Sequence, residues 1–413
     1  MRQTKIEWND LSVTACLGCF SPAGCEAAEF HAMIELNANY TNAKEQYLLL
    51  EEAVQRLTRL PELKEATLVW KHFFVSDAIN QKPYLTASAN EAVSAIQQPP
   101  LNGSKASLWL YLVENAQMSN EPDDFTVMKR PYYKHLFNTQ LHERSVVESH
   151  SPFSHSDNNT GSFSNDFASH SPLMPFPLSI EHQTNRIFDR YVQRLAQQGC
   201  TLEHNCIRTW VFVQNVDVQY AGMVAARRQY FEREGLTPQT HFIASTGIEG
   251  RYVFPDVLVM MDAYAIAGVN AEQIRYLHAP THLNPTYEYG VTFERGTTVD
   301  YGDRRHVFIS GTASINNRGE IEHPLDVEKQ TARTFDNVQA LLAEADTNMA
   351  DVACMIVYLR DIADYTAVNR YVEAHYPEIP RLTVLAPVCR PGWLVEVECL
   401  AIKAIDNKKF APF

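Results

Sequence analysis

The sequence lacks any long apolar run. Its 413 residues are 45% hydrophobic, which suits a globular protein, but no stretch approaches the roughly 18–20 apolar residues that cross a bilayer. The opening segment, MRQTKIEWNDLSV, also has no apolar core of the kind found in secretory signals. We therefore expect no membrane span and a cytoplasmic protein. Its length allows two or three domains or one large repeat assembly.

Positive charge is also in short supply. The chain has 35 Lys and Arg residues against 49 Asp and Glu residues, which gives a formal net charge of −14. This balance argues against nucleic-acid binding driven by bulk electrostatics. It also means that an anionic substrate would need a local cluster of arginine side chains to overcome the field of the whole molecule.

Motifs for disulfides, metals and cofactors are missing. The 8 cysteines stand in a chain that we expect to be cytoplasmic, so a disulfide framework is not expected. Cys16, Cys19 and Cys25 form a C-x2-C-x5-C cluster, but no fourth ligand follows at zinc-site spacing, and we interpret them as ordinary thiols. No phosphate-binding loop, dinucleotide fingerprint, HExxH or nucleophile elbow occurs, so we predict no metal and no cofactor. Four further cysteines lie on apolar faces and are predicted to be core residues: Cys200, Cys206, Cys354 and Cys399.

One supersecondary pattern occurs three times. The second copy runs from FDRYVQRLA through IRTWVFV and YAGMVAARRQYF to DVLVMMDAYAIA. The third runs from FDNVQALLAEA through VACMIVYLRDI and YTAVNRYVEAHY to WLVEVECLAIKA. A weaker first copy contains YLLLEEAVQRL, ATLVWKHFFVSDA and KASLWLYLVENA. Repeated helix, strand, helix and strand segments predict three similar units that are stacked or arranged in a ring, with clefts between them.

Composition sets the boundaries between these units. We predict a divergent first unit over residues 1–120, a connector over 121–179, a second unit over 180–270 and a third over 285–405. Within the connector, residues 145–178 are rich in Ser, His, Asn and Pro and have no apolar period. Such a segment is interpreted as a flexible insert.

The third unit is the most complete copy. HVFISGTASI is a predicted strand, followed by a helix that Asp326 caps, the strand VACMIVYLRDI and a second helix that Asp364 caps. RLTVLAPV and LVEVECLAI are further strands. The order predicts an α+β sandwich with its helices on one face of a sheet.

This unit resembles the RidA/YjgF family, also known as endoribonuclease L-PSP. The resemblance covers about 100 residues and rests on the SG after the first strand, VYLRDIADYTAVNRY, PRLTV and the terminal VEVECLAI. It implies that three units form an intrachain pseudo-trimer with ligand clefts between them. It also implies that Arg381 corresponds to the carboxylate-binding arginine of the family. The other two units lack this arginine, which predicts one specialised site.

A further resemblance, from about Cys206 to Ile402, is to chorismatases, which are built on the same unit. It rests on RTWVFV, YAGMVAARRQYF, ASTGIEG, FISGTASI with HPLDVEKQT, and VCRPGWLVEVE in that order. The chain departs from the family pattern at Val224 and Ala226, before Arg227, where Asn-x-Gly-Arg is usual.

The strand WLVEVECLAI carries two carboxyl groups. Glu396 and Glu398 alternate with Val395, Val397 and Cys399, so both point to one face. That face is either solvated or paired with cations, or it belongs to a site. The chorismatase resemblance implies that Glu396 is the general acid, whereas Glu398 is predicted to be structural. The resemblance also gives Cys389 a role in steering an intermediate to an aromatic product; the alternative is a small buried thiol.

Other candidates are assigned to substrate binding. Arg227 and Arg381 suit bidentate pairing with carboxylates, although Arg227 could instead form a surface salt bridge. Tyr220 either hydrogen-bonds a substrate hydroxyl or packs. Two glycine-containing segments, STGIEG and SGTAS, are interpreted as turns whose backbone N–H groups face an anion. Their alternative is an ordinary turn, and they contain the remaining candidates: Thr246, Gly247, Gly311 and Ala313.

These features predict a chorismatase-type enzyme that cleaves chorismate to pyruvate and a hydroxybenzoate or dihydroxycyclohexadienoate, with 3-hydroxybenzoate favoured. Two alternatives stay open: a RidA-like enamine or imine deaminase that uses Arg381, and a non-catalytic binder of small metabolites. The expected partner is a small carboxylate, with neither nucleic acid nor membrane involved. The oligomeric state is left open, with a monomer as one option.

Overall fold

The structure is a computed structural model, and it describes residues 1–25, 27–37, 42–85, 90–121, 125–145 and 178–413. Its strands form three six-stranded sheets. The predicted insert at 145–178 lies, apart from its two end residues, outside the described residues. No helix in the described part of the chain has the length and apolar character needed to cross a membrane.

The sheet of unit 1 has six strands in the order β1-β2-β3-β6-β4-β5. In that order the strands are β1 (Arg2–Trp8), β2 (Val13–Phe20), β3 (Glu29–Leu36), β6 (Ala106–Glu114), β4 (Ala66–Val75) and β5 (Ala92–Gln97). Between β3 and β4 lies α1 (Ala43–Thr58), and the described residues between β4 and β5 form the single turn α2 (Ala78–Gln81) and a 3-10 turn, Lys82–Tyr84. The second helix of this unit is therefore rudimentary.

The sheet of unit 2 has the equivalent order β7-β8-β9-β12-β10-β11. Its strands are β7 (Gln117–Glu121), β8 (Phe125–Lys129), β9 (Lys134–His142), β12 (Val259–Ala267), β10 (Cys206–Val213) and β11 (Ala244–Glu249). Its helices are α3 (Ile180–Gln197), the short α4 (Leu202–Asn205) and α5 (Val216–Arg233). The predicted connector at 121–179 is therefore wrong over its first part, because β8 and β9, which ends at His142, belong to this sheet.

The sheet of unit 3 repeats the order once more, as β13-β14-β15-β18-β16-β17. Its strands are β13 (Ile274–Leu277), β14 (Gly296–Asp300), β15 (Arg304–Ala313), β18 (Val395–Ala404), β16 (Val352–Leu359) and β17 (Arg381–Leu385). Its helices are α6 (Val327–Glu344) and α7 (Tyr365–His375). Because β13 pairs with β14, the unit begins near residue 274 rather than at the predicted 285.

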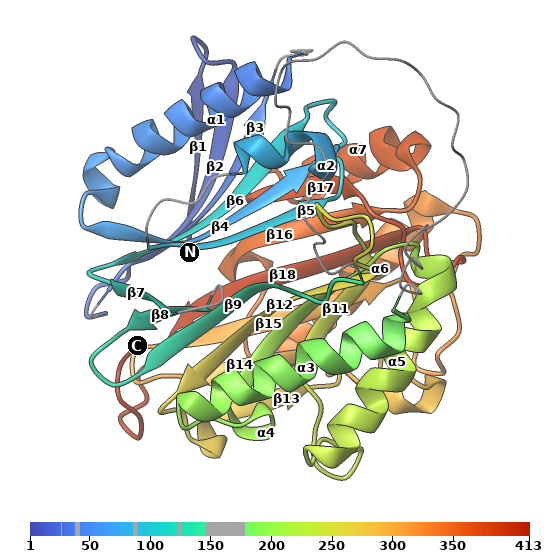
Figure 1. Cartoon of the computed structure of the whole chain (residues 1–413). Coiled ribbons are helices and arrows are strands. Elements are labelled where there is room, and N and C mark those ends of the chain that lie inside the picture. Colours follow the sequence, from blue (N-terminus) through green and yellow to red (C-terminus); the bar gives the residue numbers. More distant parts are fainter. Residues whose placement is uncertain (26, 38–41, 86–89, 122–124, 146–177) are drawn as a thin grey trace, which may run out of the picture.

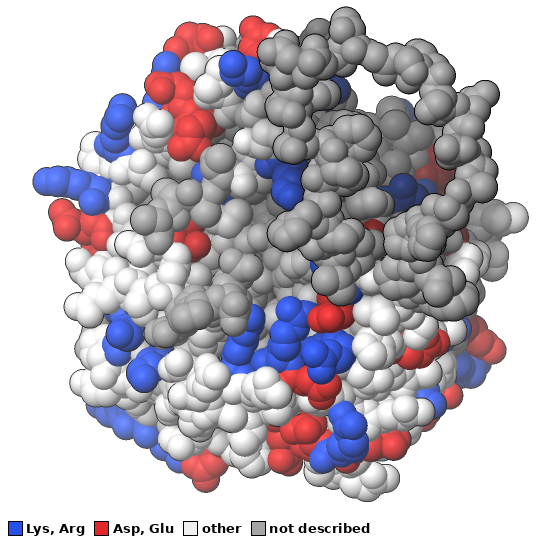
Figure 2. All heavy atoms as spheres, in the orientation of Figure 1, with Lys and Arg blue, Asp and Glu red and all other residues white. Residues whose placement is uncertain are grey.

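The three units form the predicted pseudo-trimer of α+β sandwiches. Figure 1 shows α1 over the sheet of unit 1 and α3 and α5 over the sheet of unit 2, on the outside of the molecule. In the strand β16 every residue is buried, because helices cover one face of its sheet and another unit covers the other. Acidic and basic side chains are interspersed over the face seen in Figure 2.

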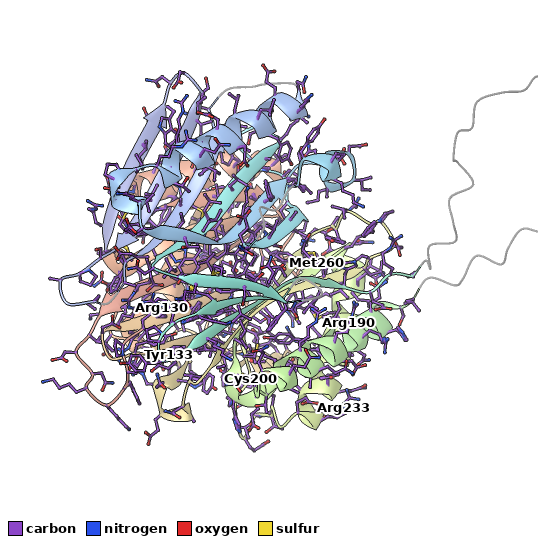
Figure 3. The ribbon with its side chains drawn as sticks, turned by 60° about the vertical axis from the view of Figure 1, so that its left-hand side comes forward. Arg130, Tyr133, Arg190, Cys200, Arg233 and Met260 are labelled. Atoms are coloured by element: carbon purple, nitrogen blue, oxygen red, sulfur yellow. The ribbon has the colours of Figure 1, made fainter. Side chains whose placement is uncertain are left out.

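Local sequence signals explain how the helices begin. Asp326 caps α6 as predicted, since its carboxylate accepts a hydrogen bond from the Lys329 backbone N–H. Asp364 precedes α7, but its side chain makes no capping bond. Asp361 instead caps the preceding 3-10 turn, Ile362–Asp364. The four cysteines predicted to be core residues are buried, and Figure 3 shows one of them, Cys200, beside the helical layer.

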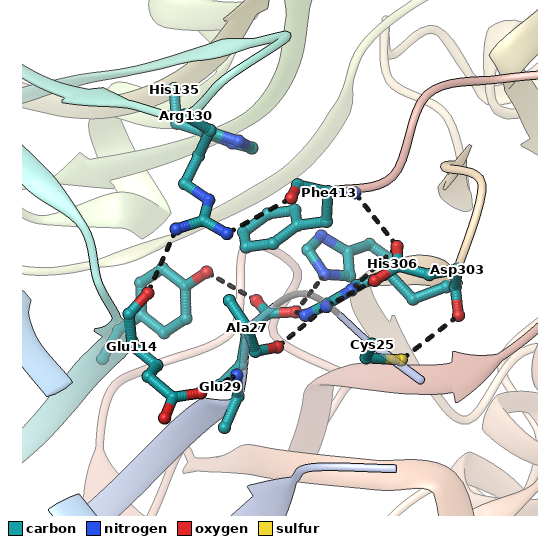
Figure 4. A network of polar contacts seen from close by, with 12 residues as sticks. Cys25, Ala27, Glu29, Glu114, Arg130, His135, Asp303, His306 and Phe413 are labelled. Atoms are coloured by element: carbon teal, nitrogen blue, oxygen red, sulfur yellow. Dashed lines mark hydrogen bonds and ion pairs between the residues drawn. The ribbon is translucent and has the colours of Figure 1, made fainter. Parts of the chain in front are cut away.

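A polar network occupies the inner faces of the sheets. By strand register, Glu29, His135 and His306 take equivalent positions in the three units. Glu29 Oε1 lies 2.6 Å from Arg304 Nη1 and 2.8 Å from His306 Nε2 (Figure 4). Burial opposes the ionisation of Glu29, but His306 and Arg304 outweigh it and hold its pKa well below the usual range. The buried side chain of Phe413 packs beside this pair.

Candidate functional site

A cavity opens at the boundary between units 2 and 3. Unit 2 contributes α5 and β11, and unit 3 contributes β15, β18, the loop before β14 and the loop between β17 and β18. The space outside the protein atoms is about 470 Å³, open solvent at the mouth included. The lining residues are Tyr220, Arg227, Ser245, Gly247, Tyr289, Val291, Phe293, Arg295, Gly311, Ala313, Ile315, Cys389, Arg390, Trp393 and Glu396.

Glu396 brings a carboxyl group into this cavity from β18. It is only 4% exposed, it pairs across the sheet with Ala313 and Tyr358, and it makes no ion pair with any described residue. Neither a solvated face nor an ion pair therefore accounts for it. Burial, followed by the nearby charge of Glu398, raises the pKa of Glu396 to about 8. The group is therefore mainly protonated at neutral pH.

Gly311 makes room for that carboxyl group. A Cβ atom at position 311 would lie 2.2 Å from Glu396 Oε1, so any side chain there would displace the acid. The predicted role of Gly311 as an anion-facing N–H is wrong, because this N–H donates to Thr246 Oγ1 at 2.9 Å. Gly247, which faces the Tyr220 ring, is likewise a site of close approach.

The two glycine-containing segments are strands rather than turns. STGIEG continues β11 through Glu249, and SGTAS continues β15 through Ala313 with a bulge between Ile309 and Thr312. Glycine marks a tight contact here, and not a reversal of the chain. Gly247 and Ala313 line the cavity, and their part in substrate binding stays a prediction, whereas Thr246 is buried behind it.

Glu398 lies next to Glu396 on the same face of β18 and faces unit 2. Its Oε2 accepts a bond from Arg208 Nη2 at 2.7 Å and one from the Thr246 hydroxyl. Its Oε1 accepts from Trp210 Nε1 at 2.8 Å. The carboxylate is therefore part of a buried ion pair between the units, in line with its predicted structural role.

Arg227 extends from α5 into the cavity. Its guanidinium is 1% exposed, so a surface salt bridge is excluded. Nε donates to Thr292 Oγ1 at 3.1 Å and Nη1 to Ser245 Oγ at 3.4 Å, while Nη2 is buried without a hydrogen-bond partner among the described residues. An unpartnered charged donor beside a cavity is suited to an anionic ligand.

Tyr220 and Cys389 complete the group that the sequence predicted. Both line the cavity. Burial, and next the charge of Glu396, raises the pKa of the Cys389 thiol to about 12. The pKa of Tyr220 is raised well above its ordinary value, first by burial and then by Cys389. At neutral pH both groups are protonated and can donate hydrogen bonds.

Two further guanidinium groups were not predicted. Arg295 is buried and donates through Nε and Nη2 to the Asn284 backbone oxygen. Arg390 donates to the Tyr289 backbone oxygen at 3.1 Å, and both guanidinium groups lie over the Tyr289 ring. Arg390 adjoins Cys389 in the VCRPGW segment, which was a usable signal, whereas Arg295 lies in a segment interpreted only as a connection.

Arg381 lies apart from this cavity. It begins β17, whose edge contacts unit 1 through the Leu101 N–H bonded to the Thr383 oxygen. Its guanidinium is 3.8 Å from Glu373. Of the two arginines assigned to substrate binding, Arg227 therefore lines this cavity and Arg381 does not. The strand register gives the reason. Arg381 in unit 3 takes the position that Ser245 takes in unit 2, and it therefore faces the boundary between units 3 and 1.

The same registers identify the counterparts of the two acids in the other units. The position of Glu396 is occupied by Met260 in unit 2 and by Ser107 in unit 1, so it is acidic in unit 3 alone. The position of Glu398 is occupied by Asp262 in unit 2 and by Trp109 in unit 1. Among the described residues no cluster of three or more His, Cys, Asp or Glu side chains is placed to hold a metal ion.

The third unit shows the family to which the chain belongs. Residues 298–403 match the family described as Endoribonuclease L-PSP. A RutC family protein of Pyrococcus abyssi (strain GE5 / Orsay) is 32% identical over 100 residues, which are 24% of this chain and 78% of the relative. The 3-aminoacrylate deaminase RutC of Acinetobacter baylyi (strain ATCC 33305 / BD413 / ADP1) is 28% identical over 97 residues, 23% of this chain and 77% of the relative. The chain belongs to the RutC family.

A solved structure extends the likeness to most of the chain. A chorismatase determined at 1.08 Å resolution aligns with 81% of this chain and 93% of its own, with a TM-score of 0.60 and 16% sequence identity. This protein therefore has the fold of a chorismatase built from RidA-like units.

Proposed function

We propose that this chain is a chorismatase-type enzyme that cleaves the enolpyruvyl ether of chorismate and releases pyruvate. One observation carries the proposal: the buried, protonated carboxyl group of Glu396 shares a cavity with the buried guanidinium of Arg227. The chorismatase-like fold supports the same class of reaction.

The chemistry needs an acid that keeps its proton near neutral pH. Cleavage of an enol ether begins when a proton is added to the terminal methylene carbon, which leaves an oxocarbenium ion. Water then adds to this ion, and collapse of the hemiketal releases pyruvate. Glu396 supplies the proton in this scheme, because burial maintains it in the acid form.

Arginine side chains orient the substrate. Chorismate carries two carboxylates, and the free Nη2 of Arg227 is placed to bind one of them. Arg295 and Arg390, on the unit 3 side of the cavity, are assigned to the other. Three guanidinium groups in one cavity provide the local positive field that a chain of net charge −14 requires.

Cys389 is assigned to the choice of product. Simple hydrolysis of the ether gives pyruvate and a dihydroxycyclohexadienoate, and loss of one water from the latter gives 3-hydroxybenzoate. The thiol, which faces the same cavity as the acid, steers the reactive diene towards the aromatic product. We therefore favour 3-hydroxybenzoate.

Incubation of the purified protein with chorismate tests the proposal directly. We expect stoichiometric pyruvate in a coupled dehydrogenase assay, and 3-hydroxybenzoate as the main aromatic product by chromatography. Chorismate that is recovered unchanged, from a protein whose folding is verified by circular dichroism, would refute the proposed activity.

A second candidate function rests on the relatives. The curated 3-aminoacrylate deaminase is similar over the third unit, and Arg381 is the residue that this activity would use. Hydrolysis of an enamine or imine that is abolished by Arg381→Gln and unaffected by Glu396→Gln would favour the deaminase.

A further inference from the structure

A buried ion pair stands directly behind the acid of the cavity. Glu398 follows Glu396 by two residues on β18, so their Cα atoms lie roughly 6.5–7 Å apart and their side chains share one face. Glu398 is 4% exposed and bonded to Arg208, Trp210 and Thr246 of unit 2. Three donors thus converge on Glu398, whereas no donor is bonded to the carboxyl group of Glu396 among the described residues.

Resting on the proposed function, we infer that Glu398 and Arg208 are positioning residues for the reaction: Glu398, held as an anion by Arg208, keeps the proton on Glu396. Neither residue lines the cavity. They act on the substrate only through the acid.

The electrostatic argument follows from the geometry. Two carboxyl groups this close in a buried region do not both ionise easily, and the one with more hydrogen-bond donors takes the charge. The donors of unit 2 fix the charge on Glu398, so the proton stays with Glu396. Without these donors the proton could reside on either carboxyl group, and Glu396 would be ionised for part of the time.

The other charged and titratable groups around Glu396 act differently. Arg208, on β10, and Arg295, in the loop before β14, lower its pKa, but these effects rank below burial and Glu398. From β16 and the β17–β18 loop, Tyr358 and Cys389 face it as neutral groups, because burial raises the pKa of both. Arg227, on α5, lies across the cavity. Glu398 is thus the anion that raises the pKa of Glu396.

The fold supplies a matched control. Asp262 occupies in unit 2 the place of Glu398 in unit 3, and it is fully buried. It faces unit 1, and its backbone neighbour two residues earlier is Met260 rather than an acid. A change at Asp262 therefore removes a buried carboxyl group of the same kind without altering the field at Glu396.

The test measures the titration of Glu396 directly. In protein labelled with ¹³C at the glutamate carboxyl carbons, the resonance lost in Glu396→Gln identifies the acid. We expect Glu398→Gln to lower its pKa by about 1–2 units, from the Coulomb energy of two charges near this distance. The basic limb of the pH profile of kcat/KM for chorismate should move to lower pH by the same amount.

Three variants separate this effect from a loss of structure. Glu398→Asp keeps the charge and should preserve the titration while lowering the melting temperature. Asp262→Asn should change stability but leave the titration and the pH profile of Glu396 in place. If Glu398→Gln does not fold, the double variant Glu398→Leu with Arg208→Met replaces the pair by apolar groups, which buried sites often tolerate. In this double variant the pKa of Glu396 should also fall, but by less than in Glu398→Gln.

The outcomes are distinct. An unmoved Glu396 resonance in folded Glu398→Gln, or a shift to higher pH in the double variant, overturns the inference. Failure of the wild-type protein to cleave chorismate overturns the proposed function instead, and the resonance still reports on Glu398.

Discussion

The boundary between units 2 and 3 and the boundary between units 1 and 2 share one backbone plan and differ in their side chains. In the first, the β17–β18 loop contributes Cys389 and Arg390 to an open cavity. In the second, the equivalent β11–β12 loop contributes Phe254, which lies between Lys82 at 4.2 Å and Arg144 at 3.9 Å. At this boundary the loop therefore brings an aromatic ring against two cationic side chains.

The buried acids of the two boundaries differ in the same way. Glu398 has Arg208 as a partner, whereas Asp262 has only the Gln140 N–H on one oxygen and no bonded partner on the other among the described residues. His72 Nδ1 is 3.8 Å from Asp262. Burial raises the pKa of Asp262 to about 7. The comparison shows that the neighbouring unit supplies a bonded cation to Glu398 and none, among the described residues, to Asp262.

The sharpest way to break this comparison is to exchange the residue that faces each boundary. Glu396→Gln keeps the shape and loses the proton donor, so pyruvate release should fall by roughly 10²–10⁴-fold, while chorismate still binds. Met260→Leu, at the equivalent position, changes volume little and should leave turnover unchanged. Steady-state kinetics with a coupled pyruvate assay decides the outcome, and equal rates for Glu396→Gln and wild type would contradict the proposed acid.

The arginines offer a second comparison. Arg227→Gln removes a charged donor from the cavity and should lower kcat/KM for chorismate by roughly 10–150-fold, as expected for the loss of a charge-assisted hydrogen bond of about 1.5–3 kcal/mol. Arg381→Gln, at the boundary with unit 1, should have little effect on this reaction. A larger loss of kcat/KM in Arg381→Gln than in Arg227→Gln would indicate that the substrate binds at the boundary between units 3 and 1.

The pH dependence of the free energy of unfolding should reveal the raised pKa of Glu396 without any substrate. The pKa of Glu396 is raised from 4.5 to about 8, so its neutral form favours the folded state. That stability is fully present below about pH 4.5 and is lost as pH rises through about 8. Glu396→Gln should therefore gain stability relative to wild type with rising pH, by about 1.4 kcal/mol per unit within this window. Urea unfolding at several pH values measures the difference, and parallel pH curves for the two proteins would rule out the raised pKa.

Cys389 is expected to affect product identity more than rate. Because burial raises the pKa of the thiol to about 12, it is a much weaker acid than Glu396 and is not the group that starts the reaction. Cys389→Ala should keep pyruvate release within a few-fold and shift the mixture from 3-hydroxybenzoate towards the dihydroxycyclohexadienoate. Chromatography of both products gives the ratio, with Cys399→Ala, a buried cysteine outside the cavity, as the control. An unchanged ratio would leave Cys389 as a packing residue.

Removal of residues 146–177 should have the smallest effect. The Leu178 backbone N–H donates to Ser145 Oγ at 2.9 Å, so the two ends can be joined with little rearrangement. The segment is rich in Ser, His, Asn and Pro, and we expect it to add little to the stability of the three units. Melting temperature and turnover should stay close to wild type, and a large loss of turnover would show that the segment takes part in the reaction.

Much of the fold was predictable because each unit repeats the same periodicities. The apolar runs of β10, β16 and β18 and the caps of the long helices are local signals. The start of unit 2 was missed for a physical reason: β7, β8 and β9 are separated from the rest of their unit by the insert, and their pairing partner, β12, follows more than a hundred residues later. Such long-range pairing leaves little trace in a local pattern.

The site was predictable where a strand's period of two decides the direction of a side chain. Glu396 and Glu398 were placed on one face for this reason. Arg295 and Arg390 were missed because their position depends on how two loops fold against each other. Arg381 was misassigned because the resemblance identified the residue but did not indicate the boundary towards which its strand faces.

The recurrence of one strand order in a single chain has a genetic consequence. In an assembly of three identical subunits, any codon change alters all three clefts at once, so an acid that damages one cleft damages every copy. Here the codons for Glu396, Met260 and Ser107 are separate positions of one gene. An acid can arise at one of them while the apolar or small residue at the others still holds the neighbouring boundaries together.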